Sequence, residues 1–164
     1  LNLMKNSITL FLGLAFFVVS LSCEAQTKSE NLEWHTDMDE AIKISHKKNK
    51  PIMLFFTGSD WCGWCIKLQK AVFKKPEFKK WAKENVILVE LDFPRRTKID
   101  PNILQQNREL ARLFAVRGYP TIWMAVPEPN NDKINFNKLG SLGASPLEVN
   151  SWIAGAKNVL KNKK

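Results

Sequence analysis

The sequence predicts an α/β fold in which a central mixed β-sheet is flanked by helices. Two runs, "PIMLFFT" (51–57) and "VILVELDF" (86–93), are largely apolar on both faces, as in strands that are buried on both sides. The residues between them have helical spacing, and a strand–helix–strand unit implies a parallel crossover. Farther on, "TIWMAV" (121–126) and the segment 134–139 are separated by a turn, which predicts an antiparallel hairpin.

The first helix is expected before the first strand. Thr36 is a suitable N-cap, and Asp37 and Asp39 place negative charge in the first turn, where it suits the helix dipole. The helix should end near Asn49, because Pro51 disfavours helical geometry in the residue before it.

The second helix is expected directly after a pair of cysteines. Its buried face should carry Ile66, Gln69, Val72 and Phe73. Pro76 either breaks this helix or begins a second piece.

The last third of the chain completes the pattern. A helix is predicted over residues 103–115, and a turn over 127–132. The final helix should begin at Pro146 with Ser145 as its cap.

Composition and charge limit the function classes. The 164 residues suit one domain with a short appendage, and 45% of them are apolar, enough for a core. The formal charge is +9, but the lysines are scattered in pairs and no basic run alternates with aromatic residues. We therefore expect a solvated basic surface and no nucleic-acid partner.

The N-terminal segment predicts export. Lys5 gives a positive start, and residues 8–21 are almost wholly apolar and uncharged. These 14 residues are fewer than the roughly 20 that a membrane-spanning helix needs. A charged start followed by a short apolar stretch is typical of a signal peptide.

The end of this signal has three interpretations. Ser22 and Cys23 resemble a bacterial lipobox, in which Cys23 would be lipidated as the new N-terminus, although Ser20 stands where such boxes usually carry Leu. The alternatives are cleavage after Ala25 and an uncleaved anchor. All three place the domain outside the cytoplasm, in the periplasm or lipid-anchored to a membrane that faces it. They imply a signal over 1–23 (or to 25), a linker over 24–33 and a domain over 34–164.

Cys62 and Cys65 are then the cysteines of the folded domain. A bridge across so short a loop removes little entropy from the unfolded chain and would be a weak staple, so the pair serves chemistry or a metal. At the first turn of a helix, backbone N–H groups and the helix dipole favour the Cys62 thiolate and lower its pKa below about 8.5. Cys65 lies nearly one turn on, so its sulfur can reach back to Cys62.

This arrangement resembles the thioredoxin superfamily. The residues that carry the resemblance are "WCGWC" (61–65), the strand before it, the helix after it, and "GYPT" (118–121) before the third strand. The resemblance covers the chain from about residue 34 onward. "FFTGSDWCGWCIKLQ" and "LVELDFP" are most similar to the exported, DsbH-like branch of single-domain thiol:disulfide oxidoreductases.

The resemblance implies a thioredoxin-like fold and roles for particular residues. Cys62 would be the nucleophile and Cys65 the resolving thiol, with their disulfide as the redox group and no further cofactor. The positions that would contact substrate are Trp61, Gly63, Trp64, Tyr119 and Pro120, the last in a cis peptide bond. Ordinary packing of Trp61 and an ordinary strand-entry proline remain the alternatives.

The sequence departs from thioredoxins in two ways. Counting back six residues from Cys62, the position of the buried Asp of thioredoxins holds Phe56. Glu90, within an apolar strand, is our candidate for proton relay, and the alternative is a side chain that points outward at the strand end. Trp64 adds no charge between the cysteines. The protein should therefore be a better reductant than the strong oxidants of the superfamily, with a reduction potential nearer about −270 mV than about −120 mV.

Two other functions stay open. One is a Cu(I) or Zn(II) carrier, although His35 and His46 are the only histidines available as further ligands. The other is a thioredoxin-fold binding module with incidental thiols. The favoured interpretation is a monomeric reductase or isomerase that acts on exported cysteine-containing proteins. Its compartment implies a membrane electron-relay protein as donor, and it would touch a membrane only through a lipid anchor.

Overall fold

The structure is a computed structural model that describes residues 32–130 and 133–163. The predicted export signal, the lipidation of Cys23 and all but the end of the predicted linker lie outside these residues. Within them, no helix combines the length and the apolar character needed to cross a bilayer.

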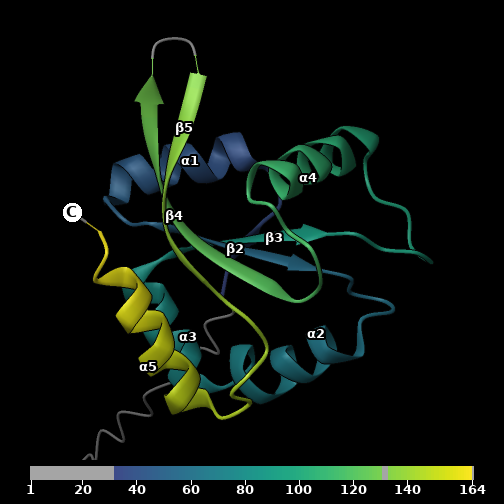
Figure 1. Ribbon diagram of the computed structural model, residues 1–164, viewed down its shortest axis with the longest axis vertical. Helices are drawn as coiled ribbons and strands as arrows, with labels where there is room; N and C mark the ends of the chain where they lie inside the picture. The colour runs from purple at the N-terminus through teal and green to yellow at the C-terminus, as the bar shows by residue number, and fades with distance from the viewer. Residues whose placement is uncertain (1–31, 131–132, 164) are drawn as a thin grey trace, which may run out of the picture. The chain divides into compact units, whose positions relative to one another are not determined.

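A five-stranded sheet forms the centre of the domain (Figure 1), in the order β1–β3–β2–β4–β5. Its strands are β1 (Trp34–His35), β2 (Ile52–Thr57), β3 (Ile87–Asp92), β4 (Thr121–Asn130) and β5 (Lys133–Leu142). β1, β3 and β2 run parallel, whereas β4 is antiparallel to β2 and to β5. The predicted mixed sheet is confirmed. β1 was not predicted, because two residues are too few to show a periodic pattern.

Helices cover both faces of the sheet (Figure 1). α1 (Met38–Lys48) and α4 (Pro101–Leu113) pack on one face, and α2 (Gly63–Leu68), α3 (Pro76–Asn85) and α5 (Val149–Leu160) on the other. Each face has its own hydrophobic core. The two cysteines belong to the core beneath α2, α3 and α5.

Aromatic rings fill the core that supports the cysteines. Phe73 packs against Phe78 with 4.7 Å between ring centroids, and it meets Phe55 and Trp152 edge-on at 5.1 and 5.3 Å. Such pairs add about 0.5–1.5 kcal/mol each to the area that they bury. Phe73 ends the π-helical segment η1 (Gln69–Phe73), which continues α2, so these contacts fix the end of the cysteine helix to the sheet.

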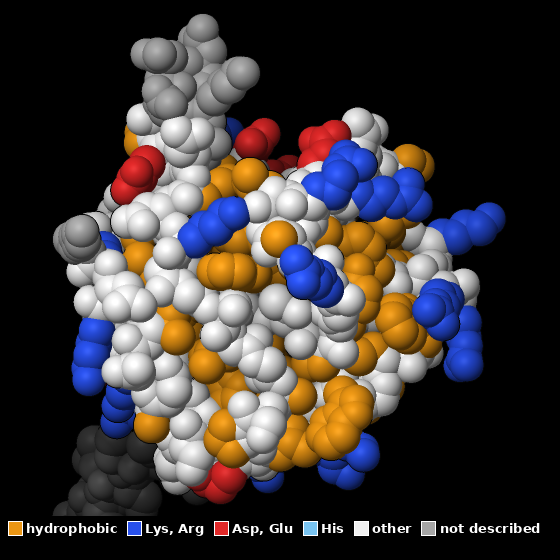
Figure 2. All heavy atoms as spheres, in the orientation of Figure 1, with side chains coloured by type: hydrophobic (Ala, Val, Ile, Leu, Met, Phe, Trp, Pro, Cys, Tyr) orange, Lys and Arg blue, Asp and Glu red, His pale blue; other side chains and the backbone are white. Residues whose placement is uncertain are grey.

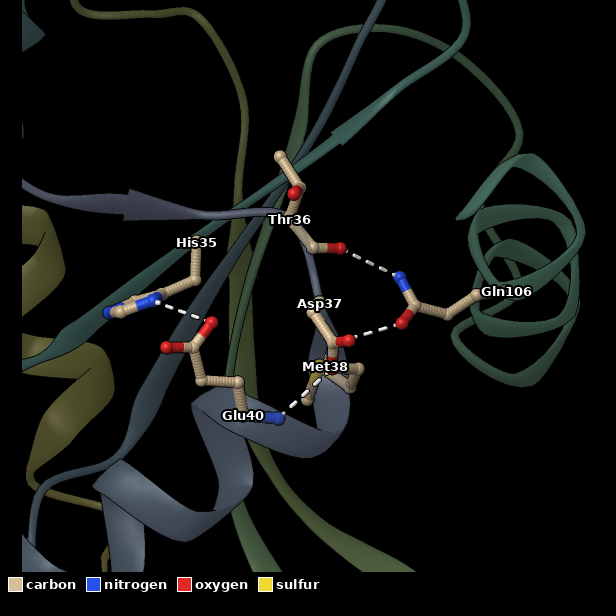
Figure 3. A network of polar contacts seen from close by, with 6 residues as sticks. All are labelled: His35, Thr36, Asp37, Met38, Glu40 and Gln106. Atoms are coloured by element: carbon tan, nitrogen blue, oxygen red, sulfur yellow. Dashed lines mark hydrogen bonds and ion pairs between the residues drawn. The ribbon is translucent and has the colours of Figure 1, made fainter. Parts of the chain in front are cut away.

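Polar contacts fix the start of α1 (Figure 3). Its N-cap is Asp37 rather than the expected Thr36, and the Asp37 carboxylate accepts from the Glu40 N–H at 3.0 Å. From α4, the Gln106 side chain accepts from the Met38 N–H at 2.8 Å and donates to the Thr36 carbonyl at 2.9 Å. Thr36 thus contributes its carbonyl, and Gln106 ties α1 to α4.

The last helix begins later than predicted. Ser145 and Pro146 precede it, and their peptide bond is cis. The cap is Glu148, whose carboxylate accepts from the N–H groups of Asn150 and Ser151 at 2.9 and 2.7 Å. Glu148 thus satisfies two backbone donors at the helix start, and it does so in place of the expected cap Ser145.

One residue expected on a buried helix face is exposed. Ile66 keeps 50% of its surface accessible. The buried face of α2 is instead set by Cys65 and Leu68, and it continues at Val72. Val72 and Phe73 are buried as predicted and Gln69 is half-buried, so the predicted face is wrong only at Ile66.

The hairpin is longer and its turn shorter than predicted. β4 and β5 pair as far as Asn130 and Lys133, so most of the expected turn at 127–132 is strand. α4 begins at Pro101, ahead of the predicted residue 103, because the Asp100 carboxylate caps it.

Candidate active site

Cys62 and Cys65 lie where β2 leads into α2. They form a disulfide with a Cα–Cα distance of 5.2 Å. Cys62 is the N-cap of α2, and its sulfur accepts the Cys65 N–H at 3.2 Å. Cys62 keeps 6% of its surface accessible, whereas Cys65 is fully buried. Of the two cysteines, Cys62 is therefore the one that a partner can approach.

Backbone contacts shape the loop that precedes the cysteines. The Gly58 carbonyl accepts from the N–H groups of Trp61 and Cys62 at 3.3 and 2.8 Å. Ser59 donates through its N–H and its hydroxyl to the Asp92 carboxylate, at 2.8 and 2.5 Å. A Cβ added to Gly58 would lie 2.4 Å from the Trp61 indole, so glycine is needed there.

Trp61 connects the cysteine loop to two other segments. Its indole N–H donates to the Phe93 carbonyl at 2.8 Å. Its ring meets that of Tyr119 edge-on with 5.7 Å between centroids. The Arg95 guanidinium lies 3.8 Å from the centre of the indole. Trp61 is thus a packing residue as well as part of the site surface.

Tyr119 and Pro120 precede β4, and the Tyr119 ring contacts Trp61 of the cysteine loop. The peptide bond between them is cis. The Tyr119 ring packs against Phe93 at 5.2 Å, and its partial burial raises the pKa of its hydroxyl. The Thr121 hydroxyl donates to the Gly118 carbonyl at 2.8 Å, which holds the turn before β4.

Trp64 is an exposed aromatic residue next to the cysteines. It keeps 56% of its surface accessible, and the Lys67 ammonium lies 4.7 Å from its ring centre. Neighbouring Ile66 is also exposed. An added Cβ at Gly63 would meet no atom within 4 Å, so packing within the domain does not require glycine there.

Glu90 lies on the sheet face that α2 covers. It pairs in register with Phe55, which packs in the same core as the cysteines. Both line a pocket whose other walls come from the domain's first residues and the α2–α3 region: Leu32, Trp34, Gln69, Phe73, Lys74 and Lys79. Burial, and then the nearby Asp92 carboxylate, raise the pKa of Glu90.

Phe56 faces the opposite core, beside Phe114. The side chain on the cysteine side of the sheet is therefore Phe55. Counting back six residues from Cys62 had placed the equivalent of the thioredoxin Asp at Phe56, one residue later. Both positions are apolar, so the departure from thioredoxins remains.

The two histidines have other partners. His35 is buried with its Nδ1 3.8 Å from the Glu40 carboxylate (Figure 3), and His46 contacts the Pro127 carbonyl through Nε2 at 3.1 Å. Within the described residues, no three side chains of the metal-binding types gather into a group.

Asp60 is a site residue that sequence reasoning missed. Its carboxylate accepts from three successive backbone N–H groups, those of Arg95, Arg96 and Thr97, at 3.0, 2.7 and 2.9 Å. These hydrogen bonds hold the pKa of Asp60 well below its usual range. The available signal was an aspartate two residues before Cys62, but its partner loop is more than thirty residues away in sequence.

Residues 33–127 match the protein family described as Thioredoxin-like. The chain belongs to this family. It is 35% identical over 131 residues to the disulfide bond reductase DsbH of Chlamydia pneumoniae, covering 80% of this chain and 74% of that protein. It is 29% identical to the thioredoxin-related protein DsbJ of the same organism, of which it spans 41%.

Solved structures agree with this assignment. A DsbH oxidoreductase superposes with a TM-score of 0.70 at 34% identity, covering 80% of this chain and 85% of that one. A thioredoxin from Thermus thermophilus, at 20% identity and a TM-score of 0.59, shares the fold.

The predictions of superfamily, fold and enzyme class are thus confirmed. The chain is a thioredoxin-like protein disulfide oxidoreductase that works by dithiol–disulfide exchange, and its redox group is the Cys62–Cys65 disulfide.

Proposed function

We propose that this protein is an exported disulfide reductase or isomerase, with Cys62 as its nucleophile and Cys65 as its resolving thiol. The observation that carries the proposal is the position of the Cys62 sulfur. It accepts a backbone N–H at the start of α2, and Cys62 is the cysteine of the pair that keeps accessible surface. A charge-assisted hydrogen bond of this kind stabilises a thiolate, which is the attacking species in exchange.

The reaction has two balanced steps. The Cys62 thiolate attacks one sulfur of a substrate disulfide, forms a mixed disulfide and releases the other substrate sulfur as a thiolate. The Cys65 thiol then loses its proton and attacks the Cys62 sulfur, which frees the second substrate sulfur and leaves the Cys62–Cys65 disulfide. The substrate gains the two electrons that the enzyme loses. Its two thiolates are protonated by the proton released from Cys65 and by one proton from water.

Glu90 is the proposed proton acceptor for the Cys65 thiol. Its raised pKa makes it a stronger base than an ordinary carboxylate, and it lies on the same face of the sheet as the cysteines. Neither cysteine lines its pocket, so the proton would travel through water. The pH profile of exchange by Glu90→Gln tests this role: we expect the rise in rate on the acidic limb, where Glu90 loses its proton, to shift or disappear, and an unchanged profile excludes it.

Substrate would bind across the exposed edge of the site. The residues we assign to this surface are Trp61, Gly63, Trp64, Tyr119 and Pro120. Supporting observations are the accessible Trp64 ring and the contact between the Tyr119 and Trp61 rings, which places Tyr119 beside the cysteine loop.

The reductive direction rests on charge and on relatives. Trp64 brings no charge between the cysteines, and the DsbH relative is named a disulfide bond reductase. Equilibration with a glutathione buffer should give a potential nearer about −270 mV than about −120 mV. A value above roughly −170 mV would contradict the reductive assignment.

Export is inferred from the N-terminal segment alone. Its positive start, apolar residues 8–21 and Cys23 support a secreted or lipid-anchored protein. Its partners would be exported cysteine-containing proteins and a membrane electron-relay donor, and the enzyme would act as a monomer. The mass of the mature N-terminal peptide distinguishes lipidated Cys23 from cleavage after Ala25.

Insulin reduction tests the function as a whole. Wild-type protein should turn over with dithiothreitol as donor, and Cys62→Ser should abolish turnover. Cys65→Ser should trap substrates as mixed disulfides on Cys62. Turnover that survives Cys62→Ser would contradict the proposal, and the metal content of reduced protein purified without chelator tests the carrier alternative.

A further inference from the structure

We propose that the enzyme prefers disulfides flanked by Asp and Glu residues, and that a cluster of four basic side chains around the cysteines reads this charge. These residues, the basic rim, are Lys67, Arg95, Arg96 and Lys98. The inference rests on the proposed function, since it specifies the substrates of the same site.

Each tryptophan beside the cysteines has a cation over its ring. Arg95 lies over Trp61 at 3.8 Å, and Lys67 lies over Trp64 at 4.7 Å. A substrate strand that contacts either ring therefore meets a positive charge. Cation–π contacts also hold these flexible side chains at the site.

The loop that carries the other cations is fixed to the active site. Asp60 holds the backbone N–H groups of Arg95, Arg96 and Thr97, and it also accepts from the Thr97 hydroxyl at 3.1 Å. The indole of Trp61 holds the Phe93 carbonyl at the start of the same loop. The segment is thus ordered by contacts from the two residues that precede Cys62.

The rim side chains form no ion pair with a carboxylate in the described part of the chain. Asp60 accepts from the backbone N–H groups of the loop rather than from its side-chain cations, and Asp92 accepts from Ser59. The charge of Asp60 offsets part of the rim's positive charge, and the four cations still outnumber it. Arg95, Arg96, Lys98 and Lys67 are all exposed.

The surface view agrees with this arrangement. Over the loops that lead into α2 and α4, on the right of Figure 2, lysine and arginine side chains surround hydrophobic ones. A partner that fits would combine an apolar side chain for Trp64 with carboxylates for the cations. Clusters of one charge sign raise association rates of oppositely charged partners ten-fold or more, in a salt-dependent manner.

The test uses three peptides that carry the same disulfide with flanking Asp/Glu, Asn/Gln or Lys residues. Each rate with the reduced full-length domain is divided by the rate of the same peptide with dithiothreitol, which removes the effect of flanking charge on the disulfide itself. At low salt we expect the normalised rate to be about ten-fold higher for the acidic peptide than for the neutral one, and lowest for the Lys peptide. Half-molar salt should remove most of the difference.

Two rim variants and a control locate the effect. The acidic-to-neutral ratio should fall toward one in Arg95→Gln/Arg96→Gln/Lys98→Gln. It should fall part of the way in Arg96→Gln/Lys98→Gln, which leaves the Arg95–Trp61 contact intact. The control Lys43→Gln/Lys47→Gln/Lys48→Gln removes the same charge from exposed positions on α1, on the other sheet face, and should keep the wild-type ratio.

A ratio near one in the wild type, or an equal loss in the α1 control, overturns the inference and leaves the proposed function standing. Absence of exchange with all three peptides and with the small neutral hydroxyethyl disulfide overturns both.

Discussion

At the scale of single residues, Gly58 shows how closely the cysteine loop is packed. Its Cα faces the Trp61 indole, and its carbonyl accepts from Trp61 and Cys62. A side chain at this position must displace Trp61, which in turn contacts Tyr119 and Arg95.

We therefore expect Gly58→Ala to lower the free energy of unfolding by about 1–3 kcal/mol and to slow exchange. Denaturant unfolding and insulin reduction measure the two effects. Gly143→Ala is a suitable control, since its added Cβ would meet no atom within 4 Å. Equal stability of the two variants would show that Trp61 can move without cost.

Glu90 gives a second prediction, for stability against pH. Because burial raises its pKa in the folded state, the folded protein holds the Glu90 proton more tightly than the unfolded chain does. The contribution of Glu90 to stability is therefore present below its ordinary value of 4.5 and is lost as the pH rises through the folded pKa.

It follows that Glu90→Gln should be more stable than wild type at pH 7, with the advantage shrinking as the pH approaches 4.5. Thermal unfolding across this range measures the difference. A variant less stable than wild type at pH 7 would mean that the charged carboxylate has a favourable partner in its pocket.

The residue scale also shows what the sequence could and could not predict of the site. The cysteines, their flanking tryptophans and Tyr119–Pro120 form contiguous motifs, so they could be found by reading along the chain. Asp60 and Arg95 could not, because their importance comes from a contact between two loops. Which of Phe55 and Phe56 faces the cysteine side of the sheet depends on how the loop between β2 and Cys62 is shaped. The number of residues in that loop does not determine this.

At the scale of elements, the loop between β3 and α4 depends on a single carboxylate. Asp60 replaces the regular hydrogen bonding that residues 95–97 lack. Because its pKa is lowered, its contribution is present above the ordinary Asp value of 3.8 and is lost only as the pH falls below that value.

We expect Asp60→Asn to speed amide hydrogen exchange of Arg95, Arg96 and Thr97 by about ten-fold or more at neutral pH. The amides of β2 should keep their wild-type protection and serve as the internal control. Unchanged exchange in the loop would show that the Phe93 and Arg95 contacts with Trp61 are sufficient to order it.

The predicted boundaries of helices were wrong where a capping side chain outside the hydrophobic pattern sets the first residue. Asp100 and Glu148 cap α4 and α5 at positions that hydrophobic spacing does not indicate. β1 is a strand only because it pairs with β3, which the sequence does not show. The β4–β5 hairpin continues past the apolar run and through two prolines, where the sequence predicted a turn. The strands β2 and β3 could be predicted, because their burial on both faces of the sheet produces a largely apolar run in the sequence.

At the scale of the whole molecule, the helices that cover both faces of the sheet leave the cysteine pair near the surface only at the start of α2. Both cores are closed by helices, and the cysteine pair belongs to one of them with only Cys62 slightly accessible. The scaffold therefore exposes Cys62 rather than Cys65, next to two tryptophans that each carry a cation over the ring. This arrangement leaves the acidity of the Cys62 sulfur as the property on which exchange depends.

Titration of the Cys62 thiol in the reduced protein tests that property most directly, with the Cys65→Ser variant used to isolate its thiolate absorbance. The predicted pKa lies at least about one unit below the 8.5 of free cysteine, and it should return to that value in denaturant. A Cys62 pKa at or above about 8.5 in the folded protein would contradict the account.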